Sequence, residues 1–465
     1  MHYLDNAATT PVRPEAVQAA VQAMTEGWGN PSSRYALGSQ AAAGVKEHRA
    51  QVAKALGCAP EELYFTSCGS EGDNWAIRGA VELGRRKGKH IITTAIEHSA
   101  VLEPCRALER EGYEVTYLAP NADGQVSMED VKAALRPDTV LVSMMLVNNE
   151  LGTLQPVAET ARAIRAAGCP ALLHCDAVQG FLKVPFTPKA LGVDLLTISG
   201  HKIHAPKGVG ALYIRKGLRF PPLIRGGGQE EGLRSGTEAT AQIAAFAAAA
   251  QAGKATLSAD LEHMAALKED LARRLPQEVP GAKVVLQGQA PHILPITLPG
   301  YKSEVIVRFL SDRGICVSSG SACHKGKPSH VYAALKLPKK ELDGVLRISS
   351  GGDKGAVYGV MTLLERYLGL DYFAAGVYDL DRNPTVTLPA MDFAENPAFR
   401  YRQSQGYGMA QDSVYRLALR LEEPRDIFAG GLWVHTFNSL LPASVYGAEH
   451  PEYYSFINGE RRPGR

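Results

Sequence analysis

Short apolar runs alternate with helical patterns between residues 60 and 215. Each run has the length and composition of a buried strand, and the segments between them repeat apolar positions at helical spacing. Strands are expected at residues 62–66, 90–94, 114–118, 140–146, 171–174, 195–199 and 210–214, and helices at 72–86, 100–111, 128–135 and 157–167. This alternation predicts an α/β fold with a mostly parallel, seven-stranded sheet wrapped by helices.

Polar clusters stand at the ends of five of these strands. They occupy residues 67–74, 97–99, 148–150, 176–179 and 199–202. Ligands in such sheets bind beyond the carboxyl ends of the strands, so we expect these clusters to converge on one site.

The alternation of strand and helix patterns gives way to a different order of elements after residue 237. A helix-rich passage runs to about residue 275, and strand-like segments follow at 283–286, 293–298 and 315–318. Beyond residue 349 aromatic residues become frequent and the strand–helix alternation ends, so a boundary is expected near residues 351–353. We predict a large domain over 1–257, whose N-terminal segment can pack with the next domain, a smaller α+β domain over 258–352, and a C-terminal α+β fragment over 353–465.

Composition narrows the class of protein. The 465 residues are 45% hydrophobic and 21% charged, and the net charge of +2 gives no reason to expect a nucleic acid or an anionic membrane as partner. The seven cysteines form no CxxC pair, which argues against a structural zinc site, and their odd number fits a reducing compartment. Neither a signal peptide nor a membrane-spanning run is recognisable, so a cytoplasmic enzyme is expected.

Lys202 is the candidate for covalent chemistry. It follows an apolar strand in the run Ser199-Gly200-His201-Lys202, and a lysine that forms a Schiff base must be partly deprotonated by burial or by neighbouring positive charge. The strand-end position and His201 are expected to supply both. A surface lysine is the alternative, and His201 with His204 could instead bind a metal ion.

Three further clusters suit a pyridoxal phosphate cofactor, although each has a structural alternative. Asp176 could keep the ring nitrogen protonated, with Gln179 at the phenolic oxygen, or it could cap a helix. The segment 67–71 could cradle a phosphate at a helix N-terminus, or Ser70 and Asp73 could form a capping box. His98 could stack on the ring, or it could be structural.

Cys323 and Arg347 complete the candidate chemistry. Cys323 lies in a Gly/Ser-rich segment that could carry a mobile thiol, activated by Lys325 or Lys327, or it could be a plain surface cysteine. Arg347 could bind an α-carboxylate through two nitrogens, or it could form a surface salt bridge. A lysine for a Schiff base and a thiol for attack together indicate sulfur extraction from an amino acid.

These pieces resemble the NifS/IscS-type cysteine desulfurases of the class V aminotransferase family, which are pyridoxal-phosphate enzymes of fold type I. The resemblance runs from Tyr3 to Ser349. The matching segments, in the family's order, are 3–10 (YLDNAATT), 29–33 (GNPSS), 97–98 (EH), 147–150 (VNNE), 176–179 (DAVQ), 199–202 (SGHK), 226–230 (GGGQE), 234–238 (RSGTE) and 319–323 (SGSAC).

The resemblance implies a role for each matched residue. Lys202 would carry the cofactor and move the Cα proton, His98 would stack on the ring and act in acid–base steps, and the Cys323 thiolate would take the substrate sulfur as a persulfide. The implied cofactor-binding residues are Gly69, Ser70, His98, Asn149, Asp176, Gln179, Ser199, His201, Lys202 and Thr237, and the implied substrate-binding residues are Asn30, Asn149 and Arg347. Thr237 would reach in from a second subunit, which implies a homodimer.

The implied reaction converts L-cysteine to L-alanine and passes sulfur to an acceptor protein, either an iron–sulfur scaffold or a tRNA thiolation enzyme. No resident metal is expected, although Cys323 could transiently ligate an iron–sulfur cluster. A selenocysteine lyase and an inactive, cofactor-binding scaffold are the alternatives. The residues at Cys68, Tyr35 and Ala205 depart from the family pattern without removing a catalytic group.

The tail departs further, because the family would end in an acidic helix. Instead, segments of the tail resemble the N-terminal, non-catalytic part of α-glucuronidase-like carbohydrate-active proteins. They are 355–359 (GAVYG), 363–369 (LLERYLG), 397–402 (PAFRYR), 434–438 (VHTFN) and 450–454 (HPEYY). No glycosidase activity is expected from a partial domain, whereas a carbohydrate-binding role or a fusion artefact would explain the abrupt join.

Overall fold

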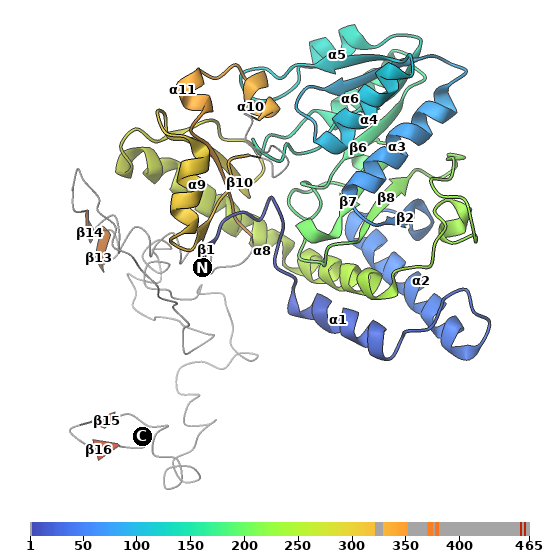
Figure 1. Cartoon of the computed structure of the whole chain (residues 1–465), viewed down its shortest axis with the longest axis horizontal. Coiled ribbons are helices and arrows are strands. Elements are labelled where there is room, and N and C mark those ends of the chain that lie inside the picture. The colour runs from blue at the N-terminus through green and yellow to red at the C-terminus, as the bar shows by residue number, and fades with distance from the viewer. Residues whose placement is uncertain are drawn as a thin grey trace. The chain divides into compact units, whose positions relative to one another are not determined.

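The computed structural model describes residues 2–320 and 329–351, together with the strand residues 370–374, 377–380, 456–457 and 460–461 (Figure 1). The chain divides into two compact units, Met1–Ala356 and Val357–Arg465. Every predicted site residue falls within the first unit, although Cys323 lies outside the described residues.

A seven-stranded sheet forms the centre of the first unit. Its strands run in the order β2-β8-β7-β6-β5-β3-β4, and only β8 opposes the direction of the others. The strands are β2 (Leu63–Thr66), β3 (His90–Thr94), β4 (Glu114–Leu118), β5 (Thr139–Ser143), β6 (Leu172–Asp176), β7 (Leu195–Ser199) and β8 (Gly210–Ile214). The predicted α/β class and the mostly parallel, seven-stranded sheet are confirmed.

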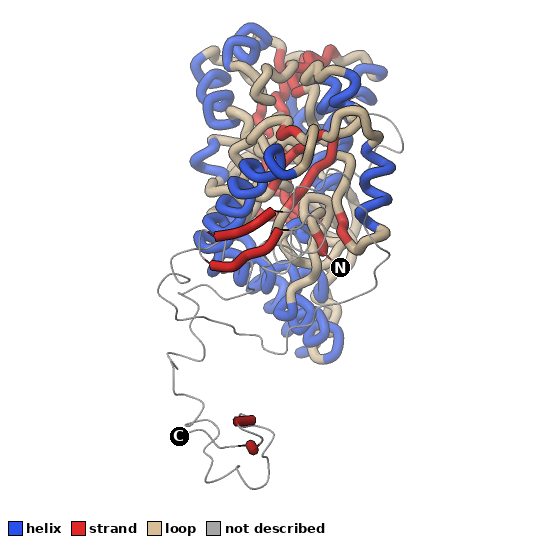
Figure 2. The backbone as a smooth tube through the Cα atoms, turned by 90° about the vertical axis from the view of Figure 1, so that its left-hand side faces the viewer, coloured by secondary structure: helices blue, strands red, loops and turns tan. Residues whose placement is uncertain are grey.

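Helices cover both faces of this sheet, as the side view shows (Figure 2). They are α1 (Pro14–Thr25), α2 (Ala36–Leu56), α3 (Gly69–Gly84), α4 (Ser99–Arg110), α5 (Met128–Ala134), α6 (Val157–Ala166), α7 (Pro188–Leu191) and α8 (Thr240–Glu278), with single turns at Pro60–Glu62, Gly200–Lys202 and Glu230–Gly232. α3 packs on β5, β7 and β8, and α8 packs on α1 and α2.

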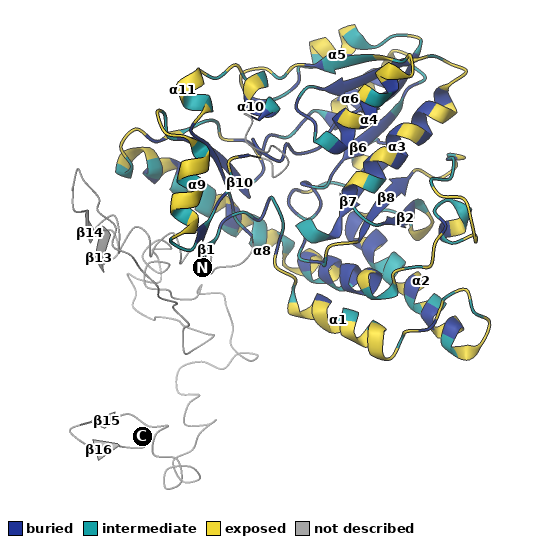
Figure 3. Ribbon diagram, in the orientation of Figure 1, coloured by how far each residue is buried: buried dark blue, intermediate teal, exposed yellow. Residues whose placement is uncertain are grey.

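Successive strand residues belong to two separate apolar clusters, because side chains of a strand alternate between the faces of the sheet. Ile91 and Leu195 pack with α3 and α4, whereas Ile92 and Leu196 pack with the cluster on the other face. Burial on both faces explains the continuous apolar runs in the sequence: β3, β5, β7 and β8 are buried throughout, whereas the edge strand β4 is mostly half-buried (Figure 3).

A smaller group of elements follows α8. β10 (Ile293–Thr297) lies between β9 (Lys283–Val284) and β12 (Val345–Ser349) in an antiparallel sheet, accompanied by α9 (Ser303–Ser311), α10 (His330–Ala334) and α11 (Lys339–Leu342). α8 runs unbroken through the predicted boundary at residue 257. The two groups of elements are therefore joined by a continuous helix.

The N-terminal segment runs from the smaller group to the large sheet. β1 (His2–Tyr3) pairs with β11 (Ile315–Cys316), and the Ser349 N–H donates to the Leu4 carbonyl at 2.8 Å. A few residues later the Thr10 N–H donates to the carbonyl of His201 at 3.0 Å. The segment therefore contacts the turn that carries Lys202.

The described part of the second unit consists of two hairpins. β13 (Leu370–Ala374) pairs with β14 (Val377–Leu380), and β15 (Phe456–Ile457) pairs with β16 (Glu460–Arg461). The rest of the predicted C-terminal fragment lies outside the described residues. Among the residues that the structure describes, no helix is long and apolar enough to cross a membrane.

Candidate active site

Lys202 lies in the single helical turn Gly200–Lys202 that follows β7. Its Nζ donates to the carbonyls of Ala7 and Ala8 at 2.6 and 2.7 Å. The N-terminal segment thus supplies two acceptors for the lysine ammonium. The loop 6–10 that positions them belongs to the matched segment 3–10, for which no role was predicted from the sequence.

Asp176 ends β6, the strand next to β7. Its Oδ1 accepts from the Val178 N–H at 2.9 Å, so the side chain also caps the turn that follows. Burial raises the pKa of Asp176, whereas the charges of His98 and Lys202 act in the opposite direction. Burial outweighs these contributions, so the pKa of Asp176 lies above its usual value.

His98 is the N-cap residue of α4 and follows β3, which is the neighbour of β5 in the sheet. Its Nδ1 accepts from the Ala100 N–H at 3.1 Å, which leaves the other ring nitrogen to carry the proton of the neutral ring. His98, Asp176 and Lys202 come from three different strand ends, as the polar clusters predicted.

A layer of buried polar groups lies next to Asp176. Glu97 is fully buried: Oε1 accepts from the Met145 N–H at 2.8 Å and from Thr94 Oγ1 at 3.0 Å, while Oε2 has no hydrogen-bond partner in the described part of the chain. Burial raises the pKa of Glu97 to about 8. Glu97 is therefore mostly protonated at neutral pH.

Asp73 and His174 belong to the same buried layer. Burial, and next the charge of Asp176, raise the pKa of Asp73 well above its usual range, and burial lowers the pKa of His174 to about 3. The 3.5 Å contact between them is consequently a contact of neutral groups. Asp73 is buried in the interior rather than placed at the start of α3. The N-cap residue of α3 is Cys68, not Ser70, and it makes no side-chain capping bond. The alternative capping box of Ser70 and Asp73 is wrong.

Small and unpaired groups gather at the N-terminus of α3. A Cβ on Gly69 would lie 2.9 Å from Val178 Cγ2 and 3.6 Å from Ser199 Cβ. Ser199 is 1% exposed, and its Oγ has no hydrogen-bond partner within the described residues. Ser70 is exposed on the first turn. A helix N-terminus beside an unpaired buried hydroxyl can accept a phosphate group.

His201 differs from its expected charge. Burial, followed by the charges of Lys202 and Lys207, lowers the pKa of His201 to about 4. The prediction that His201 supplies positive charge to Lys202 is therefore wrong, because the imidazole is neutral. Its Nδ1 lies 3.2 Å from Thr9 Oγ1, so His201 holds the N-terminal segment.

Arg347 is 1% exposed on β12. Its Nη2 lies 2.8 Å from Asp5 Oδ1 and its Nη1 donates to the Asn149 carbonyl at 3.0 Å. Nε has no hydrogen-bond partner in the part of the chain that the structure describes. Arg347 and Asn149 thus meet, whereas Asn30 is exposed and its Oδ1 caps its own turn at the Ser32 N–H, 2.9 Å away.

The ends of the segment that carries Cys323 lie beside these groups. A Cβ added at Gly320 would lie 3.6 Å from Ser329 Cβ, and Ser318 exchanges backbone hydrogen bonds with Arg347. His330 Nε2 lies 2.9 Å from the carbonyl of Glu97, next to His98. Cys323 itself lies outside the described residues, yet the chain enters and leaves its segment next to the site.

Comparisons with known proteins agree with this arrangement. The family model described as Aminotransferase class-V matches residues 2–352. A cysteine desulfurase of Trichormus azollae is 45% identical over 353 residues, covering 75% of this chain and 87% of that protein. The solved structure of a NIFS-like protein matches with a TM-score of 0.73 and 36% identity, covering 79% of this chain and 99% of that chain. The structure of SspA in complex with cysteine matches with a TM-score of 0.66 and 34% identity, covering 76% of this chain and 99% of that chain.

The chain belongs to the class V aminotransferases, and within them to the cysteine desulfurases. Residues 373–465 match a second family model, Domain of unknown function (DUF4838). The likeness of the tail to α-glucuronidase-like proteins stays a prediction. Membership of the class V aminotransferases implies pyridoxal phosphate, and the residues fit it. The orphaned Ser199 hydroxyl, the close approach at Gly69 and the buried Asp176 suit a phosphate at one end and a ring nitrogen at the other.

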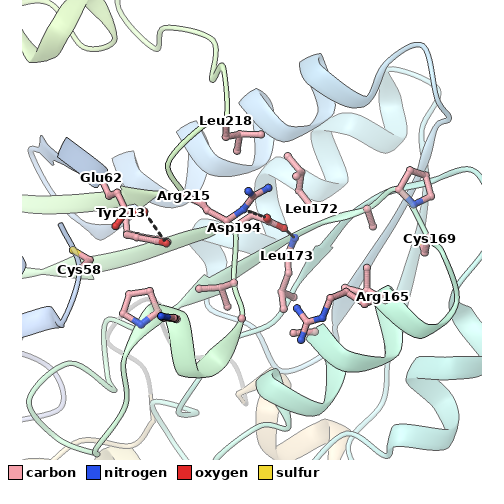
Figure 4. A pocket seen from close by; sticks show the side chains of 18 of the residues that line it. Cys58, Glu62, Arg165, Cys169, Leu172, Leu173, Asp194, Tyr213, Arg215 and Leu218 are labelled. Atoms are coloured by element: carbon pink, nitrogen blue, oxygen red, sulfur yellow. Dashed lines mark hydrogen bonds and ion pairs between the residues drawn. The ribbon is translucent and has the colours of Figure 1, made fainter. Parts of the chain in front are cut away.

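Another hollow of this desulfurase-family chain lies at the opposite end of the strands (Figure 4). It is lined by the starts of β6 and β7, and two polar contacts join residues of its lining. Arg215 Nε lies 2.7 Å from Asp194 Oδ1, and the Tyr213 hydroxyl donates to Glu62 at 3.3 Å. No predicted site residue lines it, so we assign the chemistry to the carboxyl ends of the strands.

Sequence reasoning missed the groups that position the site. The carbonyls of Ala7 and Ala8 carry no side-chain signal. Asp5 lies in a matched segment, but its ion pair with Arg347 spans 342 residues. Thr237 was predicted to serve a second subunit, and the structure places it exposed on the loop before α8.

Proposed function

We propose that this chain removes sulfur from L-cysteine, releases L-alanine and holds the sulfur as a persulfide on Cys323. The observation that carries the proposal is the convergence of Lys202, Asp176 and His98 from three strand ends, where Lys202 and His98 both act on the pKa of the buried carboxylate. The relatives that match over three quarters of the chain are cysteine desulfurases, which supports this choice.

Pyridoxal phosphate is the proposed cofactor. Asp176 would face its ring nitrogen, His98 its ring face and Gln179 its phenolic oxygen, while Ser199, His201 and the first residues of α3, Gly69 and Ser70, would hold its phosphate. When bound, the cofactor supplies an electron sink for the substrate Cα. Asn149, which is 8% exposed beside Arg347, would contact the ring or the substrate.

Lys202 is proposed to bind the cofactor and to move the proton of the substrate Cα. Its amine is held by two carbonyl oxygens, so it is aimed toward the N-terminal segment before reaction. A carbonyl accepts a hydrogen bond but no proton, so this contact orients Nζ without neutralising it. His98 would exchange protons through the ring nitrogen that the Ala100 N–H does not occupy.

The substrate carboxylate would bind Arg347, with help from Asn30. The guanidinium is buried and two of its nitrogens already have acceptors. The incoming carboxylate would use Nε and compete with Asp5 for Nη2. Because a buried guanidinium stays charged, this site would select an α-amino acid over an amine that lacks the carboxylate.

Sulfur transfer is proposed to use the Cys323 thiolate. It would attack the substrate sulfur, so that a sulfur–sulfur bond forms and the substrate Cβ–sulfur bond breaks. The carbon keeps the bonding electrons and takes up a proton, which completes alanine. The persulfide would then pass to an acceptor protein, an iron–sulfur scaffold or a tRNA thiolation enzyme.

A homodimer is proposed in which Thr237 reaches the phosphate of the other subunit. The exposed position of Thr237 on the loop before α8 supports this arrangement. The C-terminal domain of unknown function would be attached to the enzyme without contributing catalytic residues.

The test is alanine formation from L-cysteine by the full chain with pyridoxal phosphate and a thiol reductant. The parent should form alanine, and Cys323→Ala and Lys202→Ala should form little. Cofactor binding without alanine from the parent would contradict the proposal. Turnover of selenocysteine but not cysteine would replace it with a selenocysteine lyase.

A further inference from the structure

His292 lies immediately before β10 and is 1% exposed. Its Nε2 lies 3.3 Å from Oε1 of Gln179, and its carbonyl accepts from the Ser350 N–H at 3.1 Å. It therefore connects the smaller group of elements to a residue at the carboxyl end of β6.

The neighbouring carbonyl fixes the orientation of the Gln179 carboxamide. Gln179 Nε2 lies 2.7 Å from the carbonyl oxygen of Ala7, which can only accept. The opposite orientation would place two acceptor oxygens against each other. The amide nitrogen therefore faces Ala7, and Oε1 must face His292.

The orientation of the amide in turn fixes the proton of the imidazole. Because Oε1 only accepts, His292 must donate from Nε2, and Nδ1 is then the unprotonated nitrogen. Nδ1 is buried and has no hydrogen-bond partner among the residues described. Burial and the charges of Lys183, Lys268, Arg347 and Lys202 lower the pKa of His292 well below its usual range, so the ring stays neutral.

The chain of bonds ends at Lys202. The Ala7 carbonyl accepts from both Gln179 Nε2 and Lys202 Nζ, at 2.7 and 2.6 Å. Gln179 has one further N–H, which is the donor that the carboxamide can offer to a ligand. A donor at this position suits an anionic oxygen.

We infer that His292 is a positioning residue that locks the Gln179 carboxamide, so that it presents an N–H rather than a carbonyl oxygen to the cofactor's phenolic oxygen. Without the imidazole donor the amide can rotate about its last side-chain bond. The reading of Gln179 as a cofactor contact rests on the proposed function, whereas the hydrogen bond between His292 and Gln179 does not.

The first experiment needs no cofactor. Nitrogen-15 NMR of histidine-labelled apoprotein, assigned by the signal lost in His292→Gln, should show His292 protonated at Nε2 alone and not titrating between about pH 5 and 8. A proton on Nδ1, or titration in that range, would overturn the inference even if the enzyme proves active.

The second experiment reads the bound cofactor. In His292→Leu the lost donor should raise the midpoint of the pH-dependent cofactor absorbance by about 0.7 of a pH unit, a roughly five-fold change in proton affinity. His292→Gln can donate from nearly the same place and should restore the midpoint. A midpoint that is equal in His292→Leu and the parent would refute the positioning role.

His90→Leu is the matched control. His90 is fully buried and bonded to Thr139 and Thr116 at 2.8 and 2.9 Å, but it begins β3 at the far end of the sheet. It should lower the melting temperature and leave the absorbance midpoint unchanged. A shift as large as that of His292→Leu would show a general effect of packing. If the parent binds no cofactor, the proposed function fails and the NMR result still decides the inference.

Discussion

Replacing Glu97 by Gln tests whether the carboxyl group of Glu97, next to Asp176, is protonated in the folded protein. Glu97 is fully buried, and within the described residues only its Oε1 accepts hydrogen bonds. Gln keeps this acceptor and cannot ionise. The substitution therefore removes the titration while retaining the shape of the side chain and the bonds to Met145 and Thr94.

The sign of the effect follows from proton linkage. Burial raises the pKa of Glu97 from 4.5 to about 8, so the unfolded chain releases this proton at a lower pH than the folded chain. The stability of the parent is then full below pH 4.5, declines by about 1.4 kcal/mol per pH unit as pH rises toward 8, and levels off above it. The accumulated loss is on the order of 3 kcal/mol at pH 7 and 5 kcal/mol above pH 8.

Urea unfolding of apoprotein at a series of pH values measures this difference. The stability of Glu97→Gln minus that of the parent should increase steadily between pH 5 and 8, whatever the offset caused by the new amide N–H groups. Glu129→Gln, at an exposed position on α5, is the control and should follow the parent. Parallel curves for the parent and Glu97→Gln would refute the idea that Glu97 is held protonated.

Three further changes test the phosphate cradle, the N-terminal segment and the sheet. Ser199→Ala removes a buried hydroxyl without a described partner, so it should leave apoprotein stability within about 1 kcal/mol. It should weaken pyridoxal phosphate binding about ten-fold or more in a fluorescence titration, and unchanged affinity would exclude Ser199 from the cradle. Asp5→Asn breaks the pair with buried Arg347 and should cost about 2–3 kcal/mol in urea unfolding, whereas no loss would mean that the pair is not formed. Gly72→Ala places a Cβ 2.7 Å from Thr197 Cγ2 and should cost about 1–3 kcal/mol by separating α3 from β7; an unchanged melting temperature would contradict that close contact.

The large sheet could be predicted from sequence because most of its strands are buried on both faces and its helices are amphipathic. The expected strands at 90–94, 114–118, 195–199 and 210–214 match β3, β4, β7 and β8 to the residue. The extra residues assigned to the strand at 140–146 form the connection after β5, where an apolar run continues past the last ladder bond. Burial of a loop and burial of a strand leave the same pattern in the sequence.

The site was less predictable, because its positioning contacts join segments far apart in the chain. Lys202, Asp176 and His98 could be named from their places after strands. His201 was given the wrong charge, because its burial beside Lys202 is a property of the fold. His292 and the carbonyl of Ala7 gave no signal, since the first lies in an unremarkable apolar context and the second has only a backbone atom to offer.

The most direct test of the proposed function is the mass of the Cys323 peptide after the full chain, loaded with pyridoxal phosphate, has reacted with L-cysteine without reductant. We predict a gain of one sulfur atom on that peptide, removed by a thiol reductant and absent in Lys202→Ala. Alanine formation without sulfur on Cys323, or sulfur on Cys323 in Lys202→Ala, would contradict the account.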